Sequence, residues 1–410
     1  MEEDSDYSRQ PSLPDAILLD ILSRLPVKSL HRFKSVSTQF RHWISADPHF
    51  LKLHALHSAD TRHRRRRRVA VLVSRKPPAS VALRSVDADT LSDPSVVELC
   101  NDFKYSYPSA RIWNSCNGLV LISISDKTFF VWNPSTREKE HVRSIPTFSL
   151  RASTRYCLLG LGFDKITDAY KVIAAYQTDD TGDSCFMSCS SLDGTRVSSN
   201  KQRVRRIGDF PYRICKDMPG SNVGGDLFWM VVGKTGDPAI IGFDFGAEEF
   251  VEMTQLRWEP GVLKYGLGVL GGSLCVACHG EGSVEVLGLK KGGAVESWEK
   301  LFVVPYNAGD LQFKTLTPLC FTGDGEVMME IDRKRLVVYN IEEKTCRLLS
   351  YLPHEDKEEL REITRSGQGL RLNGSGFKVV VYVESLVSPS SSSKSIQNLL
   401  STVQRQLRLG

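Results

Sequence analysis

The sequence predicts an α+β protein of two parts, a small N-terminal helical domain followed by a large all-β domain with propeller-like repeats. Near the N-terminus, apolar residues recur at helical spacing. From Val69 onward, short apolar strands alternate with Gly, Asp and Asn turns, and a cassette of such strands recurs along the chain. With 410 residues, the chain is long enough for one small and one large domain.

The first expected helix begins at Pro14 and ends before Pro26, because proline is favoured at the first helical position and stops a helix from within. Aliphatic residues recur along it at the spacing of one stripe, and they are Ile17, Leu18, Ile21, Leu22 and Leu25. Nearly every face of the helix carries such a residue, which is more than a small bundle can bury. The surplus predicts a partner surface, and the open alternative is that the helices pack on the β domain.

Three further short helices are expected before residue 60. The second lies around residues 28–33. The third follows Ser37, a residue type that caps helix N-termini. The fourth follows the pair Asp47 and Pro48, which combines a capping residue with a proline at the first helical position.

A repeated cassette organises the β region. It consists of a glycine turn, an apolar strand, a turn, a second apolar strand that ends in a polar corner, and a short third strand. The leading glycines stand 107, 47 and 53 residues apart, and they are Gly118, Gly225, Gly272 and Gly325. The first gap is close to two periods, so a further copy is expected near residue 171. A period near 50 residues is typical of propeller blades, and five or six blades fit between residues 69 and 385.

Composition restricts the class of protein. No apolar run is long enough to span a membrane, and the acidic start "MEEDSDYSRQ" is unlike a secretory signal, so nucleus and cytoplasm are the expected compartments. The ten cysteines are widely scattered, as expected for reduced core or surface thiols. The net charge of +5 comes mainly from the arginine run of residues 62–68.

That run has two open interpretations. It is either a nuclear-localisation signal or a solvated linker, and the arginines concerned are Arg62, Arg64, Arg65, Arg66, Arg67 and Arg68. Sequence-specific nucleic-acid binding is not expected, because no interleaved aromatic residues accompany the run.

Three short motifs resemble chemical sites but fit strands better. "CVACH" (275–279) has the spacing of a haem attachment motif, yet alternation along a strand would direct Cys275 and Cys278 to opposite faces. "GLGVLG" (266–271) has the glycine spacing of a dinucleotide loop but precedes a strand and not a helix, so it is interpreted as a turn. "CFMSC" (185–189) fits core packing. No catalytic motif, metal site or cofactor site is expected.

Residues 13–54 resemble the F-box in its plant form, with "RLPVKSL" (24–30) followed by "VS" and "DPHF". Downstream, "CNGLVLI" (116–122), "FVWNPSTRE" (130–138) and "YVESLVSP" (382–389) are similar to the F-box associated interaction domain of F-box/kelch-like proteins. The segment 177–210 departs from that pattern, because it lacks a Trp-bearing strand corner.

The resemblance implies a non-catalytic, substrate-recognition subunit of an SCF-type cullin-RING ubiquitin ligase, which recruits a protein for ubiquitination and degradation. Its expected partners are the adaptor subunit, through it the cullin scaffold, and an unidentified protein substrate. By resemblance, the adaptor contact is lined by Leu13, Pro14, Ile17, Ile21, Leu22, Leu25, Pro26, Val27, Leu30 and Val36. The alternatives are a propeller-type interaction protein without a ligase role and a propeller enzyme that depends on a metal or cofactor.

The expected domain boundaries follow from these observations. They are a disordered N-terminus (1–11), the F-box (12–57), a basic linker (58–68), the β-propeller-like domain (69–387) and a Ser-rich tail (388–410).

Overall fold

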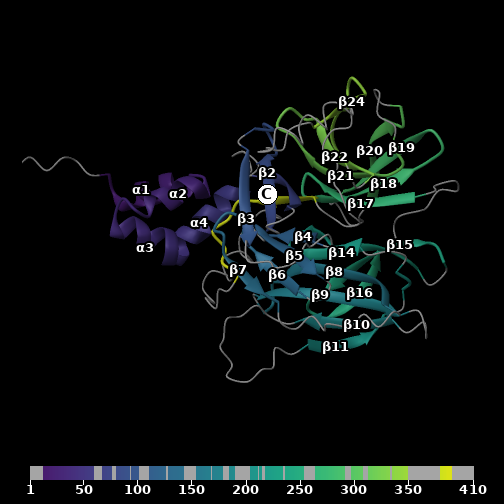
Figure 1. Ribbon diagram of the computed structural model, residues 1–410, viewed down its shortest axis with the longest axis horizontal. Coiled ribbons are helices and arrows are strands. Elements are labelled where there is room, and N and C mark those ends of the chain that lie inside the picture. The colour runs from purple at the N-terminus through teal and green to yellow at the C-terminus, as the bar shows by residue number, and fades with distance from the viewer. Residues whose placement is uncertain are drawn as a thin grey trace, which may run out of the picture.

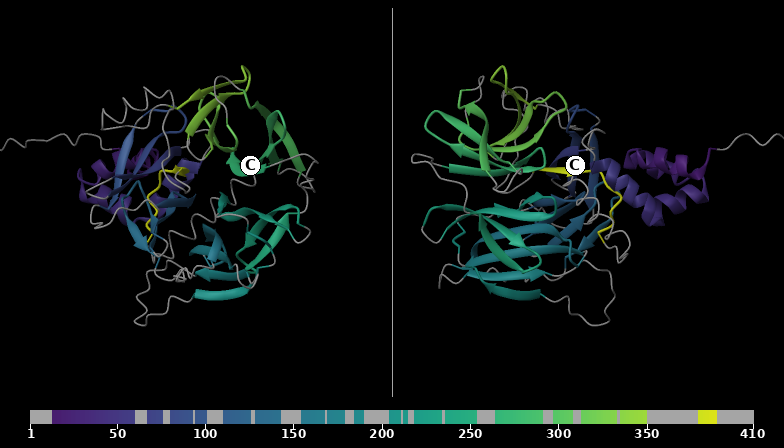
Figure 2. Two further views of the ribbon diagram at one scale, coloured as in Figure 1. Left: turned by 45° about the vertical axis from the view of Figure 1, so that its right-hand side comes forward. Right: turned by 180° about the vertical axis from the view of Figure 1, so that it is seen from behind.

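The structure of the protein is a computed structural model, in which the helical domain projects from one side of a β-propeller (Figures 1 and 2). It describes residues 13–59, 67–75, 80–92, 94–100, 110–125, 128–142, 154–167, 169–178, 184–189, 204–210, 212–214, 218–233, 236–253, 264–290, 297–307, 313–332, 335–349 and 379–389. The predicted N-terminal disorder and almost all of the Ser-rich tail lie outside these residues. No described helix is long and apolar enough to cross a membrane.

The four predicted helices are present, and they are α1 (Asp15–Ser23), α2 (Val27–Phe33), α3 (Thr38–Ala46) and α4 (Pro48–Ala59). The predicted caps are confirmed for the last two. Ser37 Oγ accepts a hydrogen bond from the Phe40 N–H at 3.0 Å, and Asp47 Oδ1 accepts one from the His49 N–H at 2.8 Å. Pro14 lies one position earlier than predicted, at the N-cap of α1, where its extended backbone leads into the helix.

The strands form six sheets among the described residues, which we call blades 1 to 6 (Figure 2). Blade 1 contains β25 (Val379–Val383), β1 (Arg67–Arg75), β2 (Ser80–Asp87) and β3 (Ser95–Cys100). Blade 2 contains β4 (Arg111–Cys116), β5 (Leu119–Ser125), β6 (Thr128–Trp132) and β7 (Lys139–His141). Blade 3 contains β8 (Thr154–Asp164), β9 (Ala169–Thr178), β10 (Ser184–Cys189), β11 (Val204–Asp209) and β12 (Met218–Pro219).

The other three blades have four strands each. Blade 4 contains β13 (Ser221–Val223), β14 (Asp226–Val232), β15 (Pro238–Asp244) and β16 (Glu249–Met253). Blade 5 contains β17 (Lys264–Leu270), β18 (Ser273–His279), β19 (Ser283–Lys290) and β20 (Ser297–Pro305). Blade 6 contains β21 (Leu316–Phe321), β22 (Val327–Ile331), β23 (Arg335–Asn340) and β24 (Thr345–Leu348). The predicted architecture is therefore confirmed, and blade 3 is the copy expected near residue 171.

Two local features of the cassette recur at equivalent places. The four leading glycines all lie in the turn between the first and second strands of a blade, and their φ angles are positive, a conformation that glycine adopts without strain. The predicted polar corner is an aspartate or asparagine whose Oδ1 accepts backbone N–H bonds at the next turn, as in Asp87, Asn133, Asp244 and Asn340.

The ring closes between the two ends of the chain. The C-terminal strand β25 pairs antiparallel with β1, from Arg67 opposite Val383 to Val71 opposite Val379. Blade 1 is thus built from strands that lie over 300 residues apart in the sequence. This pairing gives β1 a partner on the side that an open ring would leave as an exposed strand edge.

The helical domain has a small core of its own. Leu22, Leu30, Trp43, Ile44 and Phe50 are buried together between its helices. One of its contacts with the propeller is made through α4, where Ala55 packs on the core shared by blades 2 and 3. The helices are therefore not folded down onto the sheets, and most of their outer surface stays in solvent (Figure 1).

Candidate functional site: an exposed aliphatic surface on the helical domain

An aliphatic stripe runs along the outer side of α1. Ile17 and Ile21 are four residues apart, so they lie on one face of the helix, and they are 47% and 44% exposed. Leu13, which precedes the N-cap Pro14, is 53% exposed and extends the stripe beyond the start of the helix. Val36, between α2 and α3, is 65% exposed. These four account for more than half of the large hydrophobic side chains that are exposed among the described residues, the others being Ile166, Val251 and Leu301. A concentration of this kind on a small unit marks an interaction surface.

The structure divides the ten predicted contact residues into two groups. Leu13, Pro14, Ile17, Ile21, Pro26 and Val36 are exposed, and Leu25 is half-buried. The prediction needs correction for Leu22, Val27 and Leu30, whose side chains are at most 3% exposed. These three lie inside the bundle, because α3 and α4 cover that side of α1 and α2. They support the surface from beneath and do not line it.

Polar contacts fix the helix that carries the stripe. Gln39 Nε2 donates to Asp15 Oδ2 at 3.0 Å and so ties α3 to α1. Ser23 Oγ, which is buried, lies 2.9 Å from His57 Nδ1 and connects α1 to α4. Asp20 forms an i,i+4 ion pair with Arg24 at 3.0 Å. The exposed stripe is consequently presented by a helix that is held at both ends.

The helices that carry the stripe also carry basic side chains. Lys28, Arg32 and Arg41 are exposed in the structure. Lys34 is half-buried, and burial lowers its pKa despite the nearby Glu138 carboxylate. The basic character of the surface therefore comes mainly from α2 and α3, beside the aliphatic stripe.

The propeller has two unlike faces. Each inner strand ends at the face that holds the glycine turns and polar corners, and the helical domain lies against this face. The connections from one blade to the next join strand ends on the opposite, distal face. They include residues 101–110, 254–263 and 349–378, which are much longer than the two-residue glycine turns. Long connections carried on a rigid scaffold are common places for recognition.

A cavity of about 380 Å³ occupies the centre of the ring. It is lined by the inner strands, chiefly by glycine and aliphatic residues of β4, β17, β21 and β25, and its charged members are Arg67 and Glu330. Asn114 at its wall is satisfied by blade 3, because Nδ2 donates to the Leu161 carbonyl and Oδ1 accepts the Leu161 N–H, both at 2.8 Å. Asn114 thus joins blade 2 to blade 3 at the wall of the cavity.

Inner strands approach one another closely at the motif "GLGVLG". A Cβ on Gly268 would lie 2.4 Å from the Pro318 carbonyl oxygen of β21. Gly271, with φ 59°, lies in the turn to β18. The interpretation as a turn is therefore confirmed only for Gly271, because Gly266 and Gly268 lie within β17 and serve strand packing.

The motif "CVACH" is also structural. Cys275 is buried in the core between blades 5 and 6, whereas Cys278 packs on the opposite face of β18, as predicted. The His279 side chain is buried, with Nε2 accepting the Leu316 N–H at 3.2 Å and Nδ1 lying 3.2 Å from the Tyr306 hydroxyl. No group of three or more metal-ligating side chains occurs among the described residues. "CFMSC" lies on β10, but its side chains are outside the described residues.

Buried thiols keep their protons. Burial raises the pKa of Cys116 and of Cys320 to about 12, and it raises that of Cys275 further. A thiolate is the reactive form of cysteine, so these three groups are poor nucleophiles at neutral pH.

The arginine run divides at residue 67. Arg62, Arg64, Arg65 and Arg66 lie outside the described residues. Arg67 and Arg68 belong to β1 and not to a linker, which corrects the predicted boundary. Arg67 pairs with Asp89 and donates to the Phe321 carbonyl at 3.0 Å, and Arg68 is buried against Ser85. Because both guanidinium groups are engaged within the propeller, they are unsuited to an extended localisation signal.

Sequence reasoning missed one element of the interface between the domains. Leu386, in the segment that follows β25, packs on the core of the helical domain. The stretch "YVESLVSP" was noticed only as a family resemblance. No local pattern could reveal this contact, because its two sides are separated by most of the chain.

Comparisons with known proteins agree with this architecture. Residues 11–52 match the F-box domain, and residues 79–389 match the F-box associated beta propeller domain. The chain is 29% identical to the F-box protein CPR1 of Arabidopsis thaliana over 362 residues, which cover 82% of this chain and 84% of that protein. It is also 29% identical to an F-box/kelch-repeat protein of the same plant, with coverage of 80% and 88%.

Matches among solved structures are weak in both backbone and sequence. AofleA from Arthrobotrys oligospora is 11% identical, with a TM-score of 0.39, and the match covers 67% of this chain and 81% of that one. The fucose-specific lectin from Aleuria aurantia is 11% identical, with a TM-score of 0.33 and coverage of 69% and 94%. The family assignment rests on the two domain matches, one of which spans most of the chain. The chain therefore belongs to the F-box proteins that carry an F-box associated β-propeller domain.

Proposed function

We propose that this protein is the substrate-recognition subunit of an SCF-type cullin-RING ubiquitin ligase. The observation that carries the proposal is the exposed aliphatic stripe of Leu13, Ile17 and Ile21 on the F-box helices. Apolar side chains on a small helical unit form the dry centre of an interface, where a few residues dominate the affinity. The adaptor subunit is the proposed occupant, and it links the chain to the cullin scaffold.

The distal face of the propeller is the proposed target-binding surface. It points away from the F-box, and the strand ends on it are those that the long connections between blades join. A target bound there would be kept at high effective concentration near the ubiquitin carrier. In this role the chain is non-catalytic, because binding and positioning are its whole contribution. We propose the nucleus or cytoplasm as its place of action.

The exposed stripe also favours this function over a self-contained interaction protein. Such a protein would bury Ile17 and Ile21 on its own propeller, whereas both remain almost half exposed. The third alternative, a propeller enzyme, has no supporting cluster among the described residues.

The test is binding of purified full-length chain to the adaptor subunit. The double variant Ile17→Asp, Ile21→Asp should weaken binding by more than about a hundredfold, since central interface residues contribute about 2 kcal/mol or more each. Val251→Asp is the matched control, because Val251 is equally exposed but lies on the propeller strand β16. Unchanged binding of the double variant, with normal helix content by circular dichroism, would refute the proposed interface.

A further inference from the structure

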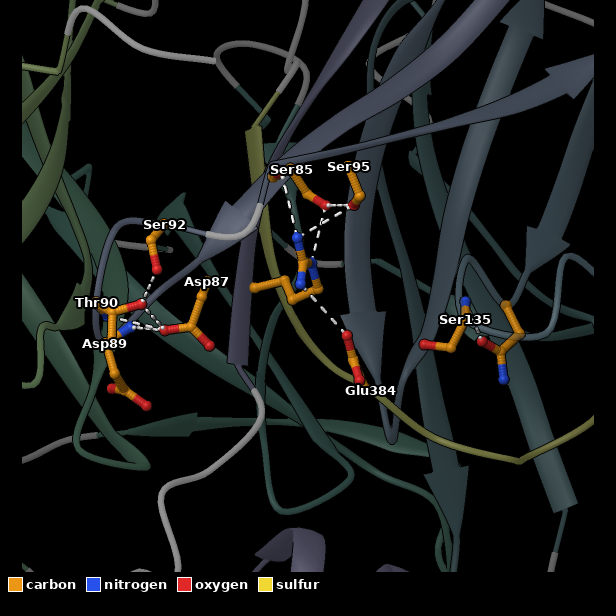
Figure 3. A network of polar contacts seen from close by, with 10 residues as sticks. Ser85, Asp87, Asp89, Thr90, Ser92, Ser95, Ser135 and Glu384 are labelled. Atoms are coloured by element: carbon orange, nitrogen blue, oxygen red, sulfur yellow. Dashed lines mark hydrogen bonds and ion pairs between the residues drawn. The ribbon is translucent and has the colours of Figure 1, made fainter. Parts of the chain in front are cut away.

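The segment after β25 crosses from the propeller to the F-box. We call residues 384–388 the C-terminal strap. At its start, the Glu384 carboxylate pairs with the Arg68 guanidinium of β1 at 3.4 Å, and both side chains are largely buried. Figure 3 shows Glu384 below the Ser85–Ser95 pair of blade 1, with Ser135 of the turn between β6 and β7 to its right. The strap therefore leaves blade 1 and passes over blade 2.

Asn133 fastens the strap to blade 2 while it also forms its own turn. Its Oδ1 accepts the Ser135 N–H at 2.8 Å, as at the other polar corners. Its Nδ2 donates to the carbonyls of Ser385 at 3.0 Å and Val387 at 2.6 Å. Asn133 is completely buried, so loss of the Nδ2 donor would leave two carbonyl groups without that bond. An aspartate at this position could form the turn but could not hold the strap.

The turn beside Asn133 is shaped for the same contact. Gly118 has a positive φ, and a Cβ on it would lie 2.2 Å from Ser385 Oγ and 2.6 Å from the Val383 carbonyl oxygen. The strap thus lies directly on the glycine turn of blade 2. A side chain at residue 118 would displace it.

Two consecutive strap residues pack into two different cores. Leu386 contacts the core of the helical domain, which contains Leu30 and Trp43. Val387 is buried in the core of blades 2 and 3, on which Ala55 of α4 also packs. Successive side chains of an extended segment point to opposite sides, so a single short stretch can join both bodies.

We propose that the C-terminal strap fixes the orientation of the F-box on the propeller, with Asn133, Gly118 and Leu386 as positioning residues. Domains within one chain move relative to each other unless their interface is large and apolar. Here the packing of α4 on the propeller is supplemented by two contacts of the strap. They are the buried hydrogen bonds from Asn133 and the packing of Leu386 on the F-box core. The fixed orientation itself does not depend on the proposed ligase function. Its consequence does: in a ligase, the bound target would be held in a fixed direction relative to the adaptor.

The experiment measures the distance between the two domains in the full-length chain. Spin labels on noncanonical amino acids replace the exposed His42 of α3 and Lys290 of β19. Asn133→Asp is compared with Asn340→Asp, its equivalent in blade 6, where Oδ1 accepts the Glu343 N–H at 2.9 Å. Aspartate already forms such corners in blades 1 and 4, so both substitutions preserve the turn.

The expected result is a single narrow distance distribution for the wild type and for Asn340→Asp. In Asn133→Asp, the width of the distribution should at least double. Leu386→Ala should also broaden it, and this variant decides the question if Asn133→Asp does not fold, because Leu386 packs outside the propeller core. Narrow distributions in both strap variants, or equal broadening in Asn340→Asp, would overturn the proposal. Adaptor affinity is measured separately, so a failure of the ligase function would not alter the distance result.

Discussion

The two domains differ in how many of their large apolar side chains are exposed to solvent. The F-box keeps Leu13, Ile17, Ile21 and Val36 exposed, whereas the much larger propeller exposes three large hydrophobic side chains among its described residues. Each pair of neighbouring blades shares a buried cluster, and ring closure through β25 leaves no blade without a neighbour. The F-box helices have no such second layer. The difference indicates that the propeller buries its apolar side chains within its own ring, whereas the exposed apolar side chains of the F-box are left for a partner to cover.

The largest expected effect concerns the small core of the F-box. Leu30→Ala removes a fully buried side chain and should destabilise the F-box by about 2–5 kcal/mol. The loss is measured as the helical transition in thermal circular dichroism. The exposed Leu13→Ala is the control and should change stability by less than about 0.5 kcal/mol. Adaptor at about a hundredfold excess over its Kd should restore about 2.7 kcal/mol of F-box stability and leave the propeller transition unchanged.

A smaller effect is expected in the propeller. Gly268→Ala would place a Cβ 2.4 Å from the Pro318 carbonyl and should destabilise the junction of blades 5 and 6 by about 1–3 kcal/mol. Gly282→Ala is the matched control in the same blade, because a Cβ there meets nothing within 4 Å. Denaturant unfolding followed by tryptophan fluorescence gives both values. If the adaptor restored the stability of Gly268→Ala as well as that of Leu30→Ala, adaptor binding would stabilise the propeller as well as the F-box. That result would contradict the difference between the two domains.

The smallest effect is a pH dependence where the domains meet. Burial lowers the pKa of His31 below 6.5, and the positive charges of Lys34 and Arg137 lower it further, although Glu138 opposes them. The propeller charges Glu138 and Arg137 act in opposite directions, and Lys34 belongs to the F-box itself, so the part of the lowering that depends on docking is the burial of His31, and through it protonation favours release. Docking should therefore be intact above about pH 6.5 and weaken as the pH falls through the lowered pKa. The distribution of distances between the F-box and the propeller is measured above pH 6.5 and again below the lowered pKa of His31. In the His31→Gln variant, the distribution should be the same under both conditions.

Local sequence determined the features that depend on near neighbours. Ser37 and Asp47 cap helices because their side chains bond N–H groups two or three residues away. The glycines of the cassette occupy turns that need positive φ, and their spacing predicted the blades. The helical part of the F-box stripe could also be found in this way, because helical periodicity places Ile17 and Ile21 on one face.

Tertiary structure decided which aliphatic residues remain in solvent. Leu22 and Ile21 are adjacent and chemically alike, yet Leu22 is buried because α3 and α4 cover its side, and Ile21 is exposed because no described helix or strand covers its side. The roles of Arg68 and Leu386 were likewise hidden, since Arg68 meets Glu384 and Leu386 meets the F-box core across more than 300 residues of sequence. A sequence pattern reports the period of one segment, whereas burial depends on which distant segment packs against it.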